Sequence, residues 1–298
     1  MPDISKSSSK RLIAIMGPTA SGKTSLAIKL AKEFNTEIIS VDSRQFYREM
    51  MKGTAKPTIG QLSEAKHHFI DNLSIHDEYS AGHFSREANA LLEELFKTHD
   101  TVIAVGGSTL YYKAFLEGID EFPGITPEAR SKVKEIENNS GFAGLQQALK
   151  AADPEYFGKV DIENPRRIVR ALEVCFSGDK PYSWYLNHKK TNHDFEIIKI
   201  GLDIPRDILY KNIEDRCDEL IANGLLEEVK QLLPFRHLKP LHTVGYTEFF
   251  EYLDGKFDRE TAITLFKQHT RNYAKRQMTW LRKEDGLKWI SPDSELNI

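Results

Sequence analysis

The stretch Gly17-Pro-Thr-Ala-Ser-Gly-Lys-Thr24 decides the fold of this chain. It has a glycine at each end of a short loop and is preceded by an apolar run over residues 12–16, while a helical pattern begins at Lys23. This is the pattern of a P-loop, in which backbone N–H groups and the positive end of a helix surround a phosphate group. An ordinary glycine-rich turn is the alternative, and the agreement of both flanking segments argues against it.

Each residue type in this loop suits the binding of a diphosphate. Glycines let the backbone N–H groups point inward at an oxyanion, Lys23 neutralises terminal phosphate charge, and the Thr24 hydroxyl can coordinate Mg²⁺. We therefore expect Thr24 to be a magnesium ligand, and the diphosphate site to comprise Gly17, Pro18, Thr19, Ala20, Ser21, Gly22, Lys23 and Thr24.

Outside the loop, short β-rich runs alternate with helical patterns, which is typical of parallel βαβ units. Buried strands are predicted over residues 12–16, 37–41, 101–105 and 197–203, and crossover helices over 23–34 and 85–97. The predicted fold class is therefore α/β, a P-loop NTPase-like parallel sheet with helices on both faces. After residue 203 the pattern is helical to the end of the chain.

The stretch from Glu117 to His193 has helical patterns without a convincing strand between them. Within it, Asn164 and Pro165 are typical of a helix start and Gly178 of a helix end. We therefore predict two domains, a catalytic core formed by residues 1–116 and 194–298 and an inserted all-helical subdomain formed by residues 117–193.

Composition excludes several classes of protein. The 41 Lys and Arg residues nearly balance the 44 Asp and Glu residues, so a chain-wide basic field is excluded and a polyanion must bind to a local patch. Two cysteines, Cys175 and Cys217, are too few for a disulfide framework and predict a reducing, cytoplasmic compartment. The polar leader over residues 1–11 and the short apolar run behind it predict neither a signal peptide nor a membrane span.

The carboxylate expected of a nucleotide hydrolase is missing from the predicted strand over residues 101–105, which ends in Gly106-Gly107-Ser108. Asp42 instead follows the second predicted strand, at the edge where the site of an open α/β sheet lies. From its position alone, Asp42 could hold magnesium or take part in proton transfer.

Two basic clusters stand out in a chain with a net charge of −3. Residues 261–283 contain no acidic residue, and Arg271, Lys275 and Arg282 lie on one face of the predicted helix. Arg166, Arg167 and Arg170 lie at a helix start, where they oppose the helix dipole. Each cluster alone is typical of a solvated face, while the two together favour binding of an RNA or DNA backbone. His67-His68 and the nearby Asp71 are interpreted as loop packing rather than as a metal site.

Motifs along nearly the whole chain resemble those of the tRNA dimethylallyltransferases, also called tRNA isopentenyltransferases. Besides the P-loop, the resemblance rests on Asp42-Ser-Arg-Gln45, Gly53-Thr-Ala-Lys-Pro57, Tyr79-Ser-Ala81, Val105-Gly-Gly-Ser-Thr-Leu-Tyr111, Asn164-Pro-Arg-Arg167, Arg170-Ala-Leu-Glu-Val174, Val244-Gly-Tyr246 and Thr270-Arg-Asn-Tyr-Ala-Lys-Arg-Gln277. The zinc finger of eukaryotic members is not found in the sequence, which predicts a bacterial-type member.

The resemblance implies transfer of a dimethylallyl group from dimethylallyl diphosphate to N6 of adenosine 37, next to the tRNA anticodon, giving N6-(dimethylallyl)adenosine. It implies that the P-loop and Mg²⁺ hold the diphosphate, and that the target base is flipped into a channel. By motif, the catalytic residues are Asp42 as general base, with Lys23 and Arg216 on the diphosphate.

The same resemblance assigns the RNA-binding residues. The anticodon stem-loop is expected to contact Asp42, Ser43, Arg44, Gln45, Ser108, Arg130, Arg166, Arg167, Ile168, Val169, Arg170, His242, Thr243, Val244, Gly245, Tyr246, Thr247, Thr270, Arg271, Lys275, Arg276 and Gln277. The insertion is expected to bind tRNA. No membrane and no obligate protein partner are expected, and the chain is predicted to be a monomer.

Three alternatives remain open from the sequence. A kinase would use the P-loop for ATP, although it leaves both basic clusters unexplained. An RNA-binding regulatory P-loop protein would explain those clusters but gives Asp42 no role. A relative that prenylates free adenine nucleotides is a close variant of the first interpretation. Whether ATP binds is not decided by the sequence.

Overall fold

The computed structural model describes residues 10–186, 191–292 and 294. These residues form two compact units, one made of the chain up to Leu116 and from Asn192 onward, and the other of Glu117–Thr191. The second unit ends two residues before the predicted boundary at 193. The reason is that His193 Nε2 lies 2.7 Å from the carbonyl oxygen of Leu116 and its ring packs against Phe195, both in the first unit.

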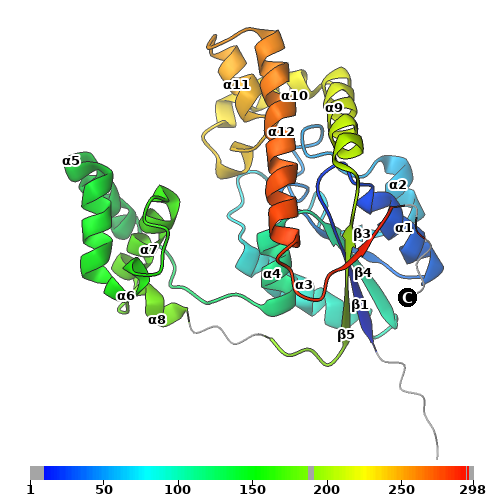
Figure 1. Ribbon diagram of the computed structural model, residues 1–298, viewed down its shortest axis with the longest axis horizontal. Helices are drawn as coiled ribbons and strands as arrows, with labels where there is room; N and C mark the ends of the chain where they lie inside the picture. Colours follow the sequence, from blue (N-terminus) through cyan, green and yellow to red (C-terminus); the bar gives the residue numbers. More distant parts are fainter. Residues whose placement is uncertain (1–9, 187–190, 293, 295–298) are drawn as a thin grey trace, which may run out of the picture. The chain divides into compact units, whose positions relative to one another are not determined.

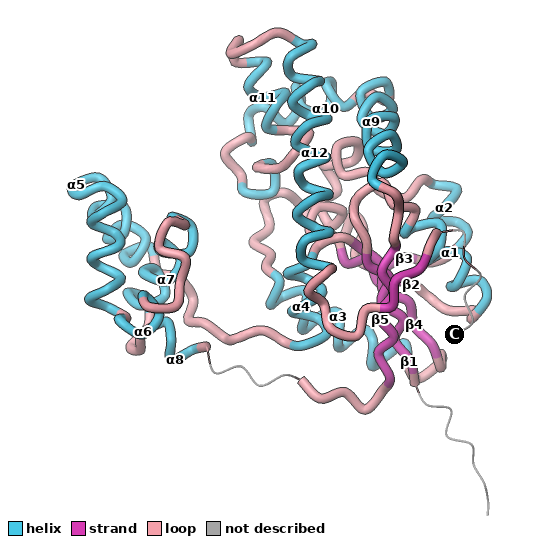
Figure 2. The backbone as a smooth tube through the Cα atoms, viewed as in Figure 1, coloured by secondary structure: helices cyan, strands magenta, loops and turns pink. Residues whose placement is uncertain are grey.

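The first unit is built on a six-stranded sheet with the strand order β3-β2-β4-β1-β5-β6 (Figure 2). Every neighbouring pair of strands is parallel. The strands are β1 (Arg11–Met16), β2 (Ile38–Val41), β3 (His67–His68), β4 (Thr101–Gly106), β5 (Glu196–Leu202) and β6 (Lys288–Ile290). The α/β fold class and the four predicted strands are thereby confirmed.

Two edge strands were not predicted. His67–His68 pairs with the start of β2, so the interpretation of these histidines as loop packing was wrong. Lys288–Ile290 pairs with Ile200–Leu202 of β5, so the prediction that the chain is helical beyond residue 203 was also wrong at this segment. Strands of two and three residues are too short to show an alternating pattern, so tertiary pairing decides their conformation.

Alternate side chains of the central strands point into two separate cores. Ile13 and Ile15 of β1 pack with helix α1 (Lys23–Glu33), which covers one face of the sheet. Leu12, Ala14 and Met16 pack into the larger core on the other face. Its helices are α3 (Ala81–Leu95), α4 (Thr109–Glu117), α9 (Arg206–Ala222), α10 (Leu225–Leu232), α11 (Thr247–Leu253) and α12 (Arg259–Leu281).

Helix starts in this unit follow the expected capping chemistry. The side chain of Ser80 accepts a hydrogen bond from the N–H of His83 at 3.2 Å and begins α3, and Asp258 accepts one from Thr261 at 2.8 Å and begins α12. Helices α9 to α12 gather beyond the carboxyl ends of the strands, above the P-loop (Figure 1). The remaining helices are α2 (Ile59–Glu64) and the short 3₁₀ turns η1 (Leu233–Phe235) and η2 (Lys239–Leu241).

The described residues of the second unit form helices joined by loops and no strand, as predicted. Asn164 Oδ1 accepts a hydrogen bond from the N–H of Arg167 at 3.3 Å, so the predicted cap is confirmed, and the helix stops before Gly178. A backbone with φ +62° at Gly141 interrupts the first helix. The helices are α5 (Pro127–Ala152), α6 (Pro154–Phe157), α7 (Pro165–Ser177) and α8 (Tyr182–Tyr185). No helix among the described residues of either unit has the length and apolar character needed to cross a membrane.

Candidate active site

The P-loop lies at the carboxyl end of β1, between its neighbours β4 and β5. The Lys23 ammonium donates hydrogen bonds to the carbonyl oxygen of Pro18 at 2.5 Å and to Ser21 Oγ at 3.4 Å. Burial, together with the positive charge of Arg216, lowers the pKa of Lys23 to about 7, and the negative charge of Asp42 opposes the shift. Without a bound anion, the Lys23 side chain is therefore only partly protonated near neutral pH, and a bound anion would favour its charged form.

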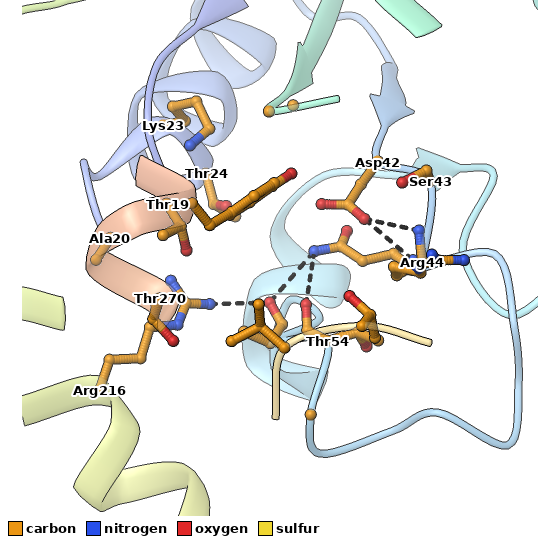
Figure 3. A pocket seen from close by; sticks show the side chains of 18 of the residues that line it. Thr19, Ala20, Lys23, Thr24, Asp42, Ser43, Arg44, Thr54, Arg216 and Thr270 are labelled. Atoms are coloured by element: carbon orange, nitrogen blue, oxygen red, sulfur yellow. Dashed lines mark hydrogen bonds between the residues drawn. The ribbon is translucent and has the colours of Figure 1, made fainter. Parts of the chain in front are cut away.

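A cavity of about 260 Å³ opens beside the P-loop. Its walls come from several parts of the first unit, among them the P-loop, the segment after β2, residues 53–57, the end of β4, residues 243–244, α9 and α12. Figure 3 shows Lys23 and Thr24 on one side of this pocket and Asp42 on the other. The predicted site residues that line it are Thr19, Ala20, Lys23, Thr24, Asp42, Ser43, Arg44, Gln45, Arg216, Thr243, Val244, Thr270 and Gln277.

Asp42 is held by the backbone that follows it. Its Oδ1 accepts hydrogen bonds from the N–H of Arg44 at 2.9 Å and of Gln45 at 3.3 Å, which is the arrangement of an Asx turn. β2 therefore delivers this carboxylate to the carboxyl edge of the sheet, where it faces the pocket opposite the P-loop (Figure 3). The carboxylate can accept a proton from a group bound between it and Lys23.

Arg216 reaches the pocket from α9, about 190 residues from the P-loop in sequence. Its Nη2 donates a hydrogen bond to the carbonyl oxygen of Ala55 at 3.0 Å. Burial lowers the pKa of this guanidinium, and Glu219 and Asp42 oppose that shift. A buried guanidinium held by a carbonyl is a suitable partner for a second phosphate group.

Residues 51–57 form one wall of the pocket and are called the 51–57 loop below. Gln45 Nε2 donates to the carbonyl oxygens of Thr54 at 3.4 Å and Ala55 at 3.3 Å, which ties the loop to the segment that carries Asp42. The Gly53-Thr-Ala-Lys-Pro57 motif supported the resemblance but was not predicted to be part of the site. The glycine and the proline of this motif, which favour a turn, were the only features of the sequence that could have indicated a loop at the site.

Ser108 does not line the pocket but supports a residue that does. It is 8% exposed, and its Oγ accepts a hydrogen bond from the N–H of Ser43 at 2.8 Å and donates to Ser43 Oγ at 3.1 Å. Tyr273 also hydrogen-bonds to Ser108, and burial together with the charge of Asp42 raises the pKa of Tyr273 to about 12. Tyr273 lines the pocket and belongs to the Thr270-Arg-Asn-Tyr-Ala-Lys-Arg-Gln277 motif that supported the resemblance.

Several residues that were assigned to RNA binding make structural contacts. The side chains of Ile168 and Tyr246 are fully buried in this structure. Tyr246 donates its hydroxyl hydrogen to Glu228, and Ile168 packs in the core of the second unit. Gln277 is 4% exposed and bonds the P-loop. On α7, the helical period places the arginines at 166, 167 and 170 on the exposed side and Ile168 on the buried side.

The cations of α12 fall into two groups. Arg271 pairs with Glu214 of α9 at 2.6 Å, and Lys267 pairs with Asp218 of α9 at 2.6 Å. The exposed cations that remain near them in the chain are Lys275, Arg276, Arg282 and Lys283. In the second unit, Arg130, Arg166, Arg167 and Arg170 are all exposed, and Val169 is half-buried. His242 and Thr247 are exposed, and Gly245 is buried.

Comparison with known proteins identifies the family of this chain. The sequence model of the IPP transferase family matches residues 45–284. The chain is 49% identical to the tRNA dimethylallyltransferase of Christiangramia forsetii, covering 96% of this chain and 94% of that protein. It is 47% identical to that of Flavobacterium johnsoniae, covering 97% and 95% of the two chains.

Solved structures give the same result. The tRNA isopentenylpyrophosphate transferase of Bacillus halodurans matches with a TM-score of 0.70 at 33% identity, covering 97% of this chain and 92% of that one. A eukaryotic dimethylallyltransferase acting on tRNA matches with a TM-score of 0.79 at 26% identity, covering 95% and 74%. The P-loop sheet, the site and these similarities agree, and the chain is therefore an enzyme that belongs to the tRNA dimethylallyltransferase (IPP transferase) family.

Proposed function

We propose that this enzyme transfers the dimethylallyl group of dimethylallyl diphosphate to N6 of adenosine 37 in the anticodon stem-loop of tRNA. The observation that carries this proposal is the pocket of about 260 Å³, in which Asp42 lies opposite Lys23 and Arg216. Such a space, with cationic groups on one side and a carboxylate on the other, suits a reaction in which an anion leaves one substrate and a proton leaves the other.

The cationic side of the pocket binds the diphosphate. Lys23, the loop amides and the positive end of α1 surround one phosphate, and Arg216 reaches the other. Negative charge grows on the diphosphate as the allylic C1–O bond breaks, so these groups stabilise the transition state more than the bound substrate. This is the largest contribution that the chain's own residues make to the rate.

The pocket also fits a magnesium ion. The Thr24 hydroxyl lines the pocket and would be its one protein ligand, and the described residues hold no cluster of three or more His, Cys, Asp or Glu that could bind a metal by themselves. This small ligand set suits Mg²⁺, which keeps several waters and takes most other ligands from substrate phosphates. Thr24 would hold the ion, which would neutralise diphosphate charge when bound.

Asp42 acts as the general base. The exocyclic nitrogen of adenine is a poor nucleophile because its lone pair is delocalised into the ring. In the balanced step, the N6–C1 bond forms, the C1–O bond breaks, the diphosphate leaves and one N6 proton moves to the Asp42 carboxylate. The two backbone hydrogen bonds to Oδ1 hold this carboxylate at the end of β2 throughout.

The target base has to leave its stack to reach this pocket. A cavity of about 260 Å³ admits a single base and a prenyl chain but no stacked helix, which is why base flipping is required. Ser43, Arg44 and Gln45 line the pocket beside Asp42, where they can contact the flipped nucleotide. The exposed cations of α12 and α7 are then available for the phosphate backbone.

The kinase alternative is less well supported. β4, the neighbour of the P-loop strand, ends at Gly106 and supplies no carboxylate for a nucleotide-bound magnesium ion. Prenylation of a free adenine nucleotide would use the same pocket but would leave the exposed basic residues without a partner. The monomeric state and the cytoplasmic location stay predictions from the sequence.

The test uses purified protein, Mg²⁺ and unmodified tRNA in two parallel reactions, one with labelled dimethylallyl diphosphate and one with labelled ATP. Incorporation of the prenyl label into tRNA, with ATP unchanged, would support the proposal. Label transferred or released from ATP, with none in tRNA from the prenyl donor, would replace it with the kinase alternative. In a third reaction, with labelled dimethylallyl diphosphate and AMP in place of tRNA, label on AMP together with none on tRNA in the first reaction would indicate the nucleotide-prenylating variant.

A further inference from the structure

We propose that Glu228 is a positioning residue for the diphosphate site, acting through the 51–57 loop on Arg216. The inference rests on the proposed function, because it assigns Arg216 to the prenyl diphosphate. Glu228 lies on α10, outside the set of residues that line the pocket. No spacing in the sequence connects it with the P-loop.

The carboxylate of Glu228 is a buried acceptor for four hydrogen bonds. The residue is 9% exposed, and its Oε2 accepts from the N–H groups of Met51 at 2.9 Å and Lys52 at 2.8 Å. Its Oε1 accepts from the N–H of Gly53 at 3.2 Å and from the Tyr246 hydroxyl at 2.6 Å. A charged acceptor that satisfies three successive backbone donors fixes the conformation of that backbone.

Tyr246 contacts both Glu228 and the 51–57 loop. It is fully buried, and a Cβ built on Gly53 would lie 2.5 Å from its ring, so the loop can approach only because residue 53 is glycine. Burial and the neighbouring carboxylate raise the pKa of Tyr246, so its hydroxyl stays protonated and donates to Glu228. Glu228, Tyr246 and Gly53 therefore form one packed unit.

The fixed backbone leads directly to the site. Two residues after Gly53, Ala55 adopts φ +50°, a left-handed conformation that is unfavourable for alanine and needs support from its surroundings. Glu228 holds the chain before Ala55, and Lys56 holds it afterwards by donating to the carbonyl oxygen of Tyr47 at 2.6 Å. The carbonyl oxygen of Ala55 accepts the hydrogen bond from Arg216, as drawn in Figure 3.

Loss of the Glu228 carboxylate would leave the backbone N–H groups of Met51, Lys52 and Gly53 without their acceptor. The loop would then relax, and the Ala55 carbonyl would no longer orient the guanidinium of Arg216. Binding of the diphosphate should weaken, whereas binding of tRNA should change little. This separates a positioning role from a general role in stability, which would lower the amount of folded enzyme without changing its Michaelis constants.

The experiment measures the KM for dimethylallyl diphosphate and the Kd for inorganic pyrophosphate, the latter by calorimetry. We expect Glu228→Ala to raise both by about tenfold, since hydrogen bonds to a charged acceptor are lost. Glu228→Gln should have a smaller effect than Glu228→Ala, because its amide oxygen can still accept from Met51 and Lys52 while its Nε2 cannot accept from Gly53. The matched control is Asp153→Asn, a buried carboxylate of the second unit that accepts the N–H of Tyr156, and it should leave both constants unchanged.

The decisive comparison is made in the Arg216→Ala background. If Glu228 acts through Arg216, then Glu228→Ala raises the pyrophosphate Kd in the wild-type background and adds nothing to the Arg216→Ala enzyme. An equal effect in both backgrounds, or no change in Kd in either, would overturn the proposal. If Glu228→Ala does not fold, Tyr246→Phe in the same two backgrounds makes the same test. The pyrophosphate measurement needs no turnover, so absence of prenyl transfer by the wild-type enzyme would count against the proposed function alone.

Discussion

Gln277 of α12 joins Thr19 of the P-loop to Gly107 at the end of β4. Its Oε1 accepts the N–H of Thr19 at 2.9 Å, and its Nε2 donates to the carbonyl oxygen of Gly107 at 2.8 Å. A Cβ on residue 107 would lie 2.3 Å from that Nε2, so the contact requires glycine there. The helix that carries the basic residues is thereby tied to the loop that binds the diphosphate.

Gln277→Glu should weaken binding of the prenyl donor. One carboxylate oxygen can still accept from Thr19, but the other would face the Gly107 carbonyl oxygen at hydrogen-bond distance without a proton between them. We expect kcat/KM for the donor to fall by about 10² or more, the effect of an unpaired buried acceptor and a misplaced loop. Gln268→Glu, on an exposed position of the same helix, is the control. Equal kinetic constants for the two variants would show that the Gln277 hydrogen bonds do not fix the conformation of the P-loop.

Asp42→Ala tests the general base. Removing the carboxylate should lower the turnover number by about 10²–10⁴, the usual contribution of a positioned base, and should leave tRNA affinity within a few-fold. Single-turnover kinetics with saturating tRNA and donor measure the chemical step directly. If the variant reacts at the wild-type rate, Asp42 is not the general base.

Lys23 should take up a proton when the diphosphate binds. In the free enzyme its pKa is lowered to about 7, so at pH 8 most of the side chain is neutral, and a bound anion raises that pKa again. Affinity should therefore fall as the pH rises above 7, relative to a Lys23→Arg enzyme that stays charged. Calorimetry of pyrophosphate binding at pH 8, in buffers of different ionisation enthalpy, should show nearly one more proton taken up by the wild type. Identical proton uptake by the two enzymes would contradict the assignment.

The exposed cations of α12 should govern the salt dependence of tRNA binding. Lys275 and Arg276 are exposed, whereas Arg271 is paired with Glu214, 57 residues earlier on α9. We expect the double variant Lys275→Ala/Arg276→Ala to lower the slope of log K against log salt by about 0.7–0.9 for each lost phosphate contact. Arg271→Ala is the matched comparison and should change the slope less. A larger change for Arg271→Ala would mean that its ion pair opens when RNA binds.

The P-loop and the central strands were predictable because their signals are local. Strand, glycine loop and helix are consecutive in the chain. Leu12 and Ile13 are both buried, in opposite cores, because the strand is packed on both faces. Asp42 was found for the same reason, since a residue that directly follows a parallel strand lies at the carboxyl edge of the sheet. The helical insertion was recognisable from the caps at Asn164 and Pro165.

The other half of the site depends on contacts between distant segments. Glu228 meets residue 53 across 175 positions, and Gln277 meets Thr19 across 258 positions. Neither pairing follows from a hydrophobic period or a motif. The residues next to Tyr246 in the sequence also do not indicate that its hydroxyl binds Glu228. Tyr273 belongs to a motif of the resemblance, but its helical pattern alone does not reveal that its side chain faces a cavity.

The central claim is that the pocket joins a prenyl carbon to an adenine nitrogen and releases diphosphate. The most direct measurement is nuclease digestion and mass spectrometry of tRNA after incubation with the enzyme, Mg²⁺ and dimethylallyl diphosphate, together with the pyrophosphate released. We predict one N6-(dimethylallyl)adenosine per tRNA, at the nucleotide 3′ of the anticodon, and one pyrophosphate for each group transferred. Release of pyrophosphate without modified tRNA, or modification at any other atom, would contradict the account.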